Sequence, residues 1–213
     1  AAGCASSVTF SWAGNPGVGS LRAFRRAVED DVPNPIDIDE YSHFGLVSRL
    51  FAGARDMPFV PIRSLLGSGL TDHNDNIRTV QNPFDPDEEV CVLPPLNPDV
   101  SIVRAQRASP EGDAHIWGIT GDVVDAAFAA DTVVLVVEEL VDTETLRSDP
   151  NRTEIPGTVV DYVVEEPYGS HPSYTQGYYG RDNTAYLEWN EQSKTHESTQ
   201  EWLDEWVYGV EDR

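Results

Sequence analysis

Residues Thr132–Val137 form a continuous run of β-branched and leucine side chains, and this run constrains the fold more than any other segment. A strand that is apolar on both faces is typical of a parallel sheet covered on both sides. The alanine-rich segment Val123–Ala130 precedes the run and predicts a helix, and Val100–Ala105 predicts an earlier strand. The order strand, helix, strand therefore predicts an α/β domain with a largely parallel sheet.

Strand and helix patterns alternate along the rest of the chain. Further strands are expected at Val8–Trp12, Phe59–Ile62, Ile77–Val80, Val90–Leu93, Ala114–Gly118 and Thr158–Val164. Further helices are expected at Leu21–Glu29, Asn183–Ser193 and Thr199–Tyr208, the last two rich in Trp and Tyr. We expect an open, mostly parallel sheet flanked by helices, with a small antiparallel element, over residues 1–180. Residues 181–213 are expected to form a helical extension that packs on the domain or on a partner.

Two loops are predicted from their turn-forming residues. In Pro33–Asp39, either Asp37 or Asp39 is expected to cap the following helix. In Asn82–Pro86, the two prolines lack backbone N–H donors, so this segment is not expected to lie in a central strand.

The stretch Tyr41–Gly69 combines an amphipathic helix, a short apolar strand and a Gly/Ser-rich loop. The helix is expected to bury apolar residues spaced three or four apart, namely Phe44, Val47, Leu50, Phe51 and Ala54. The loop offers a cation, two hydroxyls and a backbone that a ligand can approach closely. These residues are Arg63, Ser64, Gly67 and Ser68. A loop that follows a strand end is the usual ligand crevice of an open α/β sheet.

The charge composition excludes several classes of partner. The chain has 37 acidic and 14 basic residues, a formal net charge of −23, and Lys194 is its single lysine. This charge would repel nucleic acid and anionic membranes. Because the acids are dispersed among aromatic residues, the pattern indicates a folded, halophilic protein rather than a disordered tail. The apolar runs are too short to span a bilayer.

The two cysteines, Cys4 and Cys91, match no metal or redox spacing and are expected to be buried free thiols in a reducing cytoplasm.

Three further segments contain residues that could have a function, but their sequences favour a structural role. Gly14–Ser20 lies between a strand and a helix, yet it lacks the spacing of a nucleotide-binding loop and is interpreted as a tight turn. Glu138 and Glu139 are neighbours on a strand, so they point to opposite faces and cannot form a catalytic dyad. Tyr168–Pro172 is interpreted as a packed turn or a partner contact.

Seven segments of the chain, taken in order, carry a family resemblance. They are EYSHFG (Glu40–Gly45), MPFVPIRSLLGSGL (Met57–Leu70), AQRASPEGDAHIWGITGD (Ala105–Asp122), VVEELVDTE (Val136–Glu144), DPNRTEIPG (Asp149–Gly157), EEPYGSHPSYTQGYYGRD (Glu165–Asp182) and WLDEWVYGV (Trp202–Val210). The chain resembles the A (alpha) subunit of family I coenzyme A transferases, and most closely the glutaconate CoA-transferase branch, over essentially its whole length. Against the family pattern, the opening part with its glycine-rich turn is expected to be missing.

The resemblance implies a CoA-transferase-type α/β fold and a defined chemistry. In this family a glutamate attacks the thioester of an acyl-CoA, and a glutamyl-CoA intermediate then passes the CoA to a second carboxylic acid. The glutamate comes from a B (beta) subunit, so this chain is expected to supply half of an active site in a heterodimer or larger hetero-oligomer. The substrate is a coenzyme A thioester, and no metal or permanently bound cofactor is implied.

The resemblance also draws attention to the start of the helix after Tyr41. His43 occupies a position where ketoacid transferases carry glutamine and CoA-ester hydrolases of ring-degradation pathways carry glutamate. We expect Ser42 and His43 to contact substrate, and His43 to orient the substrate or the partner's glutamate as an auxiliary catalytic group. A histidine that is simply satisfied at a helix start is the structural alternative.

Three functional hypotheses follow. The first is the A (alpha) half of an acyl-CoA:carboxylate CoA-transferase. The second is a CoA-ester hydrolase of a ring-degradation pathway, which would need no acceptor acid. The third is a ligand-sensing or structural domain that keeps the fold without activity.

Overall fold

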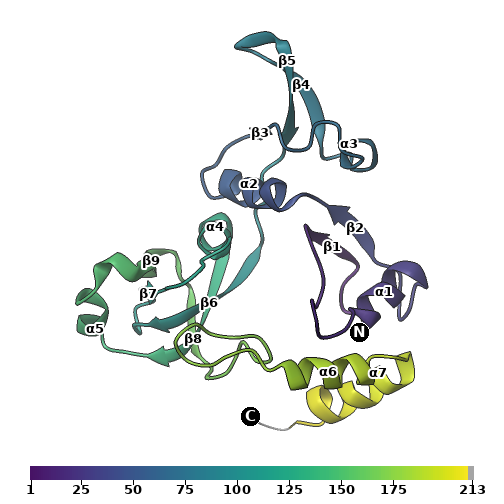
Figure 1. Cartoon of the computed structure of the whole chain (residues 1–213). Helices are drawn as coiled ribbons and strands as arrows, with labels where there is room; N and C mark the ends of the chain where they lie inside the picture. The colour runs from purple at the N-terminus through teal and green to yellow at the C-terminus, as the bar shows by residue number, and fades with distance from the viewer. Residues whose placement is uncertain (211–213) are drawn as a thin grey trace. The chain divides into compact units, whose positions relative to one another are not determined.

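The computed structural model describes residues 1–210, which form two compact units (Figure 1). The terminal unit combines residues 1–41 with the C-terminal segment that begins at Asp182, and the central unit is Ser42–Arg181. The boundary at Arg181 lies beside the predicted one at residue 180. Residues 1–41, however, group with the C-terminal helices rather than with the central sheet.

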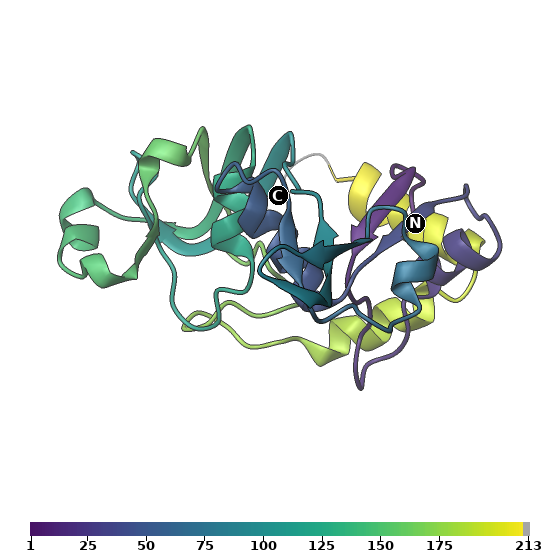
Figure 2. The same cartoon turned by 90° about the horizontal axis from the view of Figure 1, so that it is seen from above.

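The terminal unit contains two parallel strands and three helical segments. They are β1 (Ser7–Phe10), α1 (Arg22–Glu29), β2 (Asp37–Glu40), α6 (Asn183–Gln192) and α7 (His196–Leu203), followed by a π-helical turn at Asp204–Tyr208. Figures 1 and 2 show the purple N-terminal elements beside the yellow-green and yellow helices. Arg26 joins them, because its guanidinium donates to the Ser193 carbonyl at 2.6 Å and to the Thr199 hydroxyl at 2.9 Å.

The segment after β1 is a packed turn, as its sequence predicts. Gly17 and Gly19 have positive φ angles of 78° and 111°, which only glycine adopts readily. A Cβ on Gly19 would lie 2.4 Å from the Asn190 side chain. The side-chain oxygen of Asn190, Oδ1, accepts a hydrogen bond from the Ser20 backbone amide at 3.2 Å. A side chain of α6 therefore occupies the space beside the turn.

The predicted loop over 33–39 is wrong in its second half. Asp37–Glu40 forms β2, paired with β1, and the helix cap is Ser42, whose hydroxyl accepts from the Gly45 amide at 3.0 Å. The strand escaped prediction because it is largely solvent-exposed and three of its four residues are acidic, a residue type that is uncommon in strands.

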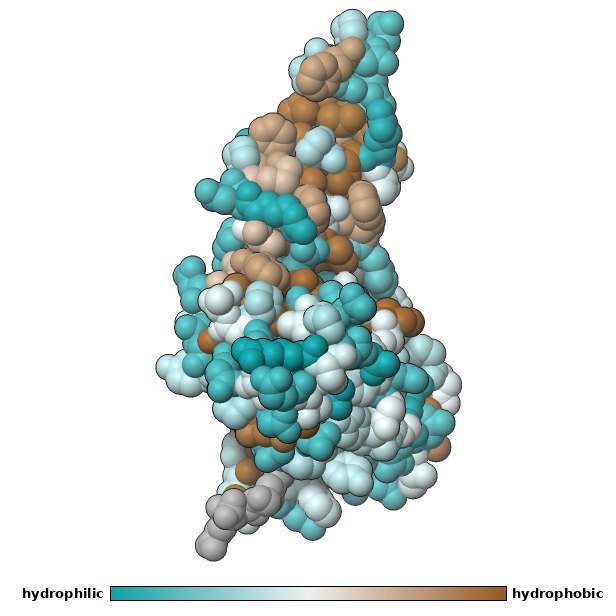
Figure 3. Space-filling model, turned by 90° about the vertical axis from the view of Figure 1, so that its left-hand side faces the viewer, coloured by the Kyte–Doolittle hydropathy of each residue, from teal (hydrophilic) through white to brown (hydrophobic). Residues whose placement is uncertain are grey.

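The central unit begins with helices on a three-stranded antiparallel sheet. Its elements are α2 (His43–Gly53), β3 (Val60–Ile62), α3 (Leu70–His73), β4 (Arg78–Asn82) and β5 (Asp85–Leu93), with strand order β3-β5-β4. Hydrophobic surface gathers over this sheet (Figure 3), where Phe84 at the hairpin tip is 95% exposed. The loop predicted over 82–86 is shorter than expected, and the expectation that it avoids a central strand is wrong, because β5 includes Pro86 and is the middle strand of this sheet. The proline is accommodated because β3 pairs only with residues 91–93, so within the described residues β5 has no neighbour on that side at Pro86. The register of β4 and β5 shifts there, and Gln81 reaches the Pro86 carbonyl with its side chain.

The second sheet of the central unit has the order β10-β8-β6-β7-β9. Its strands are β6 (Val100–Ala108), β7 (Ala114–His115), β8 (Thr132–Leu140), β9 (Thr153–Ile155) and β10 (Tyr162–Glu165). The β6, β8 and β10 strands are parallel, whereas β7 and β9 pair antiparallel. Helix α4 (Val123–Ala129) packs on β6, and the main core lies around Val103, Leu135 and Val137. The predicted fold class, mostly parallel with a small antiparallel element, is confirmed.

Short helical segments complete this unit. They are α5 (Thr143–Arg147) and two 3₁₀ turns at Pro150–Arg152 and Gly157–Val159. The last strand was predicted from Thr158, but it begins only at Tyr162 because the 3₁₀ turn occupies the preceding residues.

The predicted buried face of α2 is wrong in part. Leu50 is buried as predicted, but the two phenylalanines are not. Phe44 is 61% exposed and Phe51 is 39% exposed, whereas the buried residues are Gly45, Ser48, Arg49, Leu50 and Ala52. Small side chains let this helix approach its neighbours closely: a Cβ on Gly45 would lie 3.5 Å from Leu93 and 3.6 Å from Leu65. An apolar periodicity therefore identified the helix and its buried Leu50, but it wrongly assigned Phe44 and Phe51 to the core.

The described part of the chain contains no helix long and apolar enough to cross a membrane. Of the two cysteines, Cys91 is buried as expected, but Cys4 is exposed. Both are free thiols.

Candidate functional site

A cavity of about 480 Å³ opens beside the second half of β6 in the central unit. We call it the β6 cavity. Its walls come from three segments, which are β6 itself, the loop after β7 and the loop after β10. The lining residues are Arg104, Ala105, Gln106, Ile116, Trp117, Gly118, Ile119, Thr120, Val123, Ser170, Ser173, Tyr174, Thr175 and Gln176. None of them is acidic, and Arg104 is the one basic residue.

The cavity exists because β7 follows β6 for a short distance only. The two strands pair at Arg107 and Ala108, after which the chain leaves the sheet. The Gln106 side chain then takes the place of ladder hydrogen bonds. Its amide donates to the Trp117 carbonyl at 2.9 Å and to the Gln176 carbonyl at 3.4 Å, and its oxygen accepts from the Trp117 amide at 3.3 Å. One buried glutamine therefore holds two walls of the cavity at a fixed distance from β6.

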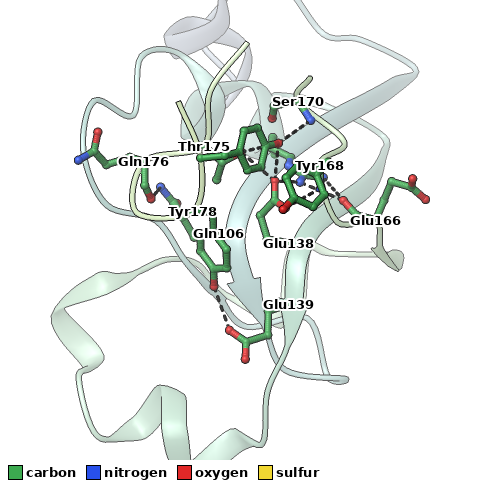
Figure 4. Close-up of polar contacts among 11 residues, drawn as sticks. Gln106, Glu138, Glu139, Glu166, Tyr168, Ser170, Thr175, Gln176 and Tyr178 are labelled. Atoms are coloured by element: carbon green, nitrogen blue, oxygen red, sulfur yellow. Dashed lines mark hydrogen bonds and ion pairs between the residues drawn. The ribbon is translucent and has the colours of Figure 1, made fainter. Parts of the chain in front are cut away.

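Next to the cavity, the buried carboxylate of Glu138 on β8 organises the loop after β10 (Figure 4). It accepts from the Tyr179 hydroxyl at 2.7 Å, the Thr175 hydroxyl at 2.8 Å and the Tyr168 amide at 2.8 Å. It also forms an ion pair with Arg104, whose guanidinium donates to the Glu166 carbonyl at 3.0 Å. We call these residues the Glu138 network.

The network keeps Glu138 ionised. Burial by itself would raise the pKa of this carboxyl, but the hydrogen bonds from Tyr179, the Tyr168 amide and Thr175, together with Arg104, lower it below its ordinary value. A carboxylate held by four donors is well stabilised as an anion and is poorly available as a nucleophile. Its chemistry here is to fasten the loop that forms one wall of the cavity.

Glu139, the next residue, makes a separate contact on the other side of β8. Glu138 is buried and Glu139 is exposed, and the regular pairing of β8 with β6 on either side of Glu138 places neighbouring side chains on opposite faces, as predicted. Glu139 accepts from the Tyr178 hydroxyl at 2.9 Å. Burial, followed by this hydrogen bond and the negative charge of Glu139, raises the pKa of Tyr178 to about 12. Tyr178 thus binds Glu139 (Figure 4), and the next residue, Tyr179, binds Glu138.

His115 on β7 is fully buried and was not singled out from the sequence. Its Nε2 lies 3.1 Å from the Leu146 carbonyl, and the Arg107 Nε donates to its Nδ1 at 3.4 Å. Burial, together with the positive charge of Arg107, lowers the pKa of His115 and favours the neutral ring. This histidine ties β7 to α5.

The residues predicted to bind substrate lie elsewhere in the central unit, around α2 and β3. Ser42 caps α2, and His43 is exposed in its first turn. Arg63 forms a bidentate ion pair with Glu88, at 2.5 and 3.0 Å. Hydrogen bonds from Arg63 and Asn82 lower the pKa of Glu88 to about 2.

The remaining three predicted residues form the turn after β3. Ser64 is exposed, Gly67 has a φ of 72° with open space around it, and the Ser68 hydroxyl donates to the Leu65 carbonyl at 2.8 Å. None of the six predicted residues lines the β6 cavity. Their role in substrate binding stays a prediction.

The sequence carried a signal for the residues that were missed. Arg104 and Gln106 flank the buried Ala105 in β6, and Glu138, already expected to be structural, follows the apolar run of β8. A buried polar group must find a hydrogen-bonding partner, so such positions mark a network. Thr175 and Tyr179 gave no comparable signal, because they lie between Pro172 and the helix that begins at Asn183, where no strand or helix pattern is present.

Within residues 1–210, no group of three or more His, Cys, Asp or Glu side chains is placed to hold a metal ion.

Comparison with known proteins identifies the family. The sequence model of a family described as "Coenzyme A transferase" matches residues 19–166. The chain belongs to the coenzyme A transferase family. The A (alpha) subunit of 3-oxoadipate CoA-transferase from Pseudomonas knackmussii is 42% identical over 211 residues, which are 99% of this chain and 74% of that protein. The corresponding A (alpha) subunit of glutaconate CoA-transferase from Acidaminococcus fermentans is 36% identical over 93% of this chain and 66% of that protein.

The fold agrees with this membership of the CoA-transferase family. The crystal structure of glutaconate coenzyme A-transferase from Acidaminococcus fermentans superposes with a TM-score of 0.91 and 34% identity. The match covers 97% of this chain and 69% of that chain. The resemblance drawn from seven sequence segments is confirmed, and so is the predicted class of function, a CoA-transferase subunit of the alpha type. The hydrolase alternative is not better supported.

Proposed function

We propose that this chain is the alpha-type half of an acyl-CoA:carboxylate CoA-transferase that acts on dicarboxylates or oxo acids and works with a beta-type partner. The observation that carries the proposal is its 42% and 36% identity to the alpha-type subunits of two such transferases, over nearly the whole chain. Its substrate is a coenzyme A thioester, and no permanently bound cofactor is invoked.

The proposed reaction needs a carboxylate nucleophile, which the partner would supply. A glutamate of the partner attacks the thioester carbonyl and expels the CoA thiolate, giving a mixed anhydride. The thiolate then attacks the glutamyl carbonyl, releases the first acid and leaves a glutamyl-CoA thioester. A second carboxylate takes the CoA by the reverse steps. The β6 cavity supports this division of labour, since no acidic residue lines it and the nearby Glu138 is bound by four donors.

The first turn of α2 is proposed as this chain's contribution near the reacting group. His43 is exposed there and able to donate a hydrogen bond to a carbonyl or carboxylate, and Ser42 precedes it. Arg63 is proposed to bind a substrate carboxylate in exchange for Glu88, because both carboxylates present the same pair of acceptors. Ser64, Gly67 and Ser68 would then form the adjoining backbone wall.

An uncovered sheet face supports the proposal of a partner. Ile102 on β6 is 75% exposed, and Tyr162 and Val164 on β10 point to the same face and are also exposed. Parallel sheets are normally covered on both faces, so this one is suited to packing against further protein. We propose a heterodimer or larger hetero-oligomer that is located in the cytoplasm and adapted to high salt.

The test is to purify the chain together with a beta-type partner and to incubate the pair with an acyl-CoA, with and without an acceptor acid. Transfer requires the acceptor, whereas hydrolysis does not. Mass spectrometry of the complex should show a substrate-dependent CoA adduct on the partner. CoA release that proceeds equally without acceptor would refute the proposal in favour of hydrolysis. Unchanged turnover in His43→Ala would remove that residue from the mechanism.

A further inference from the structure

We propose that the β6 cavity binds the amide-bearing pantetheine arm of the acyl-CoA. This inference rests on the proposed function, because it names the part of that substrate that this chain holds. Within CoA, the pantetheine arm is a neutral chain with two amides, one free hydroxyl, a pair of methyl groups and the sulfur at its end, and the cavity presents complementary chemistry.

The charge of the cavity favours a neutral ligand. Its one cation, Arg104, is already paired with Glu138 and donates two hydrogen bonds to the Glu166 carbonyl. No acidic residue lies in the lining to attract a cation. A phosphate or carboxylate would bring a second anion to an arginine that is already neutralised, so neither matches the site as well as an amide does.

The walls carry hydrogen-bonding groups that the protein itself does not use. The hydroxyls of Thr120, Ser170 and Ser173 and the side-chain amide of Gln176 form no hydrogen bond within residues 1–210. Figure 4 shows the Gln176 amide pointing away from the Glu138 network. The buried Arg104 Nε also has no partner among the described residues. Hydroxyls and a primary amide both donate and accept, which is what a chain of alternating N–H and C=O groups requires.

Apolar residues lie between these polar groups. Ile116, Trp117, Val123 and Tyr174 share the lining, and the exposed Ile119 belongs to it as well. A chain with methylene groups between its amides and a pair of methyl groups at one end would contact these side chains while its amides reach the hydroxyls.

The walls are held in place before any ligand binds. Gln106 fixes the Trp117 and Gln176 backbones relative to β6, and the Glu138 network fixes the segment that carries Ser170 and Thr175. A preformed site loses little conformational freedom on binding, which favours affinity for a flexible chain such as pantetheine.

The test is calorimetric titration of the purified chain with pantetheine. Ser173→Leu fills the cavity and should weaken binding at least tenfold, and Gln176→Ala should weaken it about threefold to tenfold through loss of a hydrogen bond. Thr158→Leu, an exposed threonine outside the lining, is the matched control and should bind as the parent does. Adenosine 3′,5′-bisphosphate, the anionic end of CoA, should not compete with pantetheine.

The outcomes separate this inference from the proposed function. If pantetheine does not bind, or binds Ser173→Leu as tightly as the parent while the circular dichroism of the two is the same, the cavity assignment is wrong. An active complex whose Michaelis constant for acyl-CoA is unchanged by Ser173→Leu overturns the assignment and leaves the transferase function intact. Conversely, cavity-dependent pantetheine binding without any CoA transfer overturns the function and keeps the binding site.

Discussion

Two consecutive tyrosines offer a matched pair of substitutions that tests the Glu138 network. Tyr179→Phe removes a 2.7 Å hydrogen bond to the buried Glu138 carboxylate, and it also takes away the acceptor of the Ser170 amide at 3.0 Å. Tyr178→Phe removes a 2.9 Å bond to the exposed Glu139. Both changes delete one hydroxyl and keep the ring, so they differ only in what that hydroxyl contacts.

The expected magnitudes follow from burial. Loss of a hydrogen bond to a buried charge, with a partly buried amide left unpaired, costs about 2 to 3 kcal/mol of unfolding free energy. Loss of a surface contact costs about 0 to 1 kcal/mol. With a urea m value of about 2 kcal/mol/M, Tyr179→Phe should lower the unfolding midpoint by about 1 M and Tyr178→Phe by less than half of that. Equal midpoints for the two variants would refute the network as a stabilising element.

The dependence of this difference on pH gives a second check. The folded-state pKa of Glu138 is lowered, so its contribution is present above the unfolded value of about 4.3 and is lost as pH falls through the folded value. The gap between the two variants should therefore narrow as the pH is lowered from 7 towards and below 4. In Glu138→Gln, which has no charge to lose, the effect of Tyr179→Phe should be smaller and independent of pH. A gap that widened towards acid would contradict the assignment.

Three further predictions concern single groups. Tyr178 should ionise near pH 12, measured by tyrosinate absorbance, and Tyr178→Phe should remove the absorbance change at that pH. Its raised pKa contributes stability that is fully present below about pH 10 and is lost as the pH rises towards 12. Glu88 should titrate near pH 2 by carboxyl NMR and return towards its ordinary value in Arg63→Ala, while an unchanged value would exclude the ion pair. Gly53→Ala should lower the unfolding free energy by about 1 to 3 kcal/mol, because the added Cβ would lie 2.3 Å from the backbone oxygen of Leu96. Gly69→Ala, where the added Cβ would meet open space, should lower it by less than about 0.5 kcal/mol in the same urea assay.

Features set by local sequence could be predicted, and the strands of the parallel sheet show why. A run that is apolar on both faces, such as Thr132–Val137, strongly favours a sheet strand, and it forms most of β8. Its residues Val133, Leu135 and Val137 are buried, whereas the residues between them are only half-buried. The helix at 123–129 follows from its alanines. The opposed faces of Glu138 and Glu139 follow from the two-residue period of any strand.

What could not be predicted depends on contacts between distant parts of the chain. The partners of Glu138 lie 30 to 41 residues away along the chain, so no local sequence pattern predicts these contacts. The buried face of α2 was missed for a related reason. Close packing of α2 against its neighbours requires small residues, and Gly45, Ser48 and Ala52 are buried there. A hydrophobic periodicity is identified mainly from large apolar side chains, which here are the exposed Phe44 and Phe51.

The excess of acidic residues makes a prediction about salt that can be argued in full. The chain has 37 acidic and 14 basic residues, so its net charge is −23 and its carboxylates repel one another in the folded state. Surface ion pairs such as Arg63–Glu88 offset only part of this repulsion. Raising KCl from 0.1 to 1 M shortens the Debye length from about 10 to about 3 Å, so the unfolding temperature should rise with salt. Sucrose stabilises without screening charge, and it serves as the control for general solvent effects. Asp87→Asn combined with Glu89→Gln removes two exposed charges beside Glu88 and should raise stability at 0.1 M KCl more than at 1 M. If the unfolding temperature is the same at both salt concentrations, repulsion between carboxylates does not limit the stability of the chain. The proposal that the protein is adapted to high salt would then be refuted.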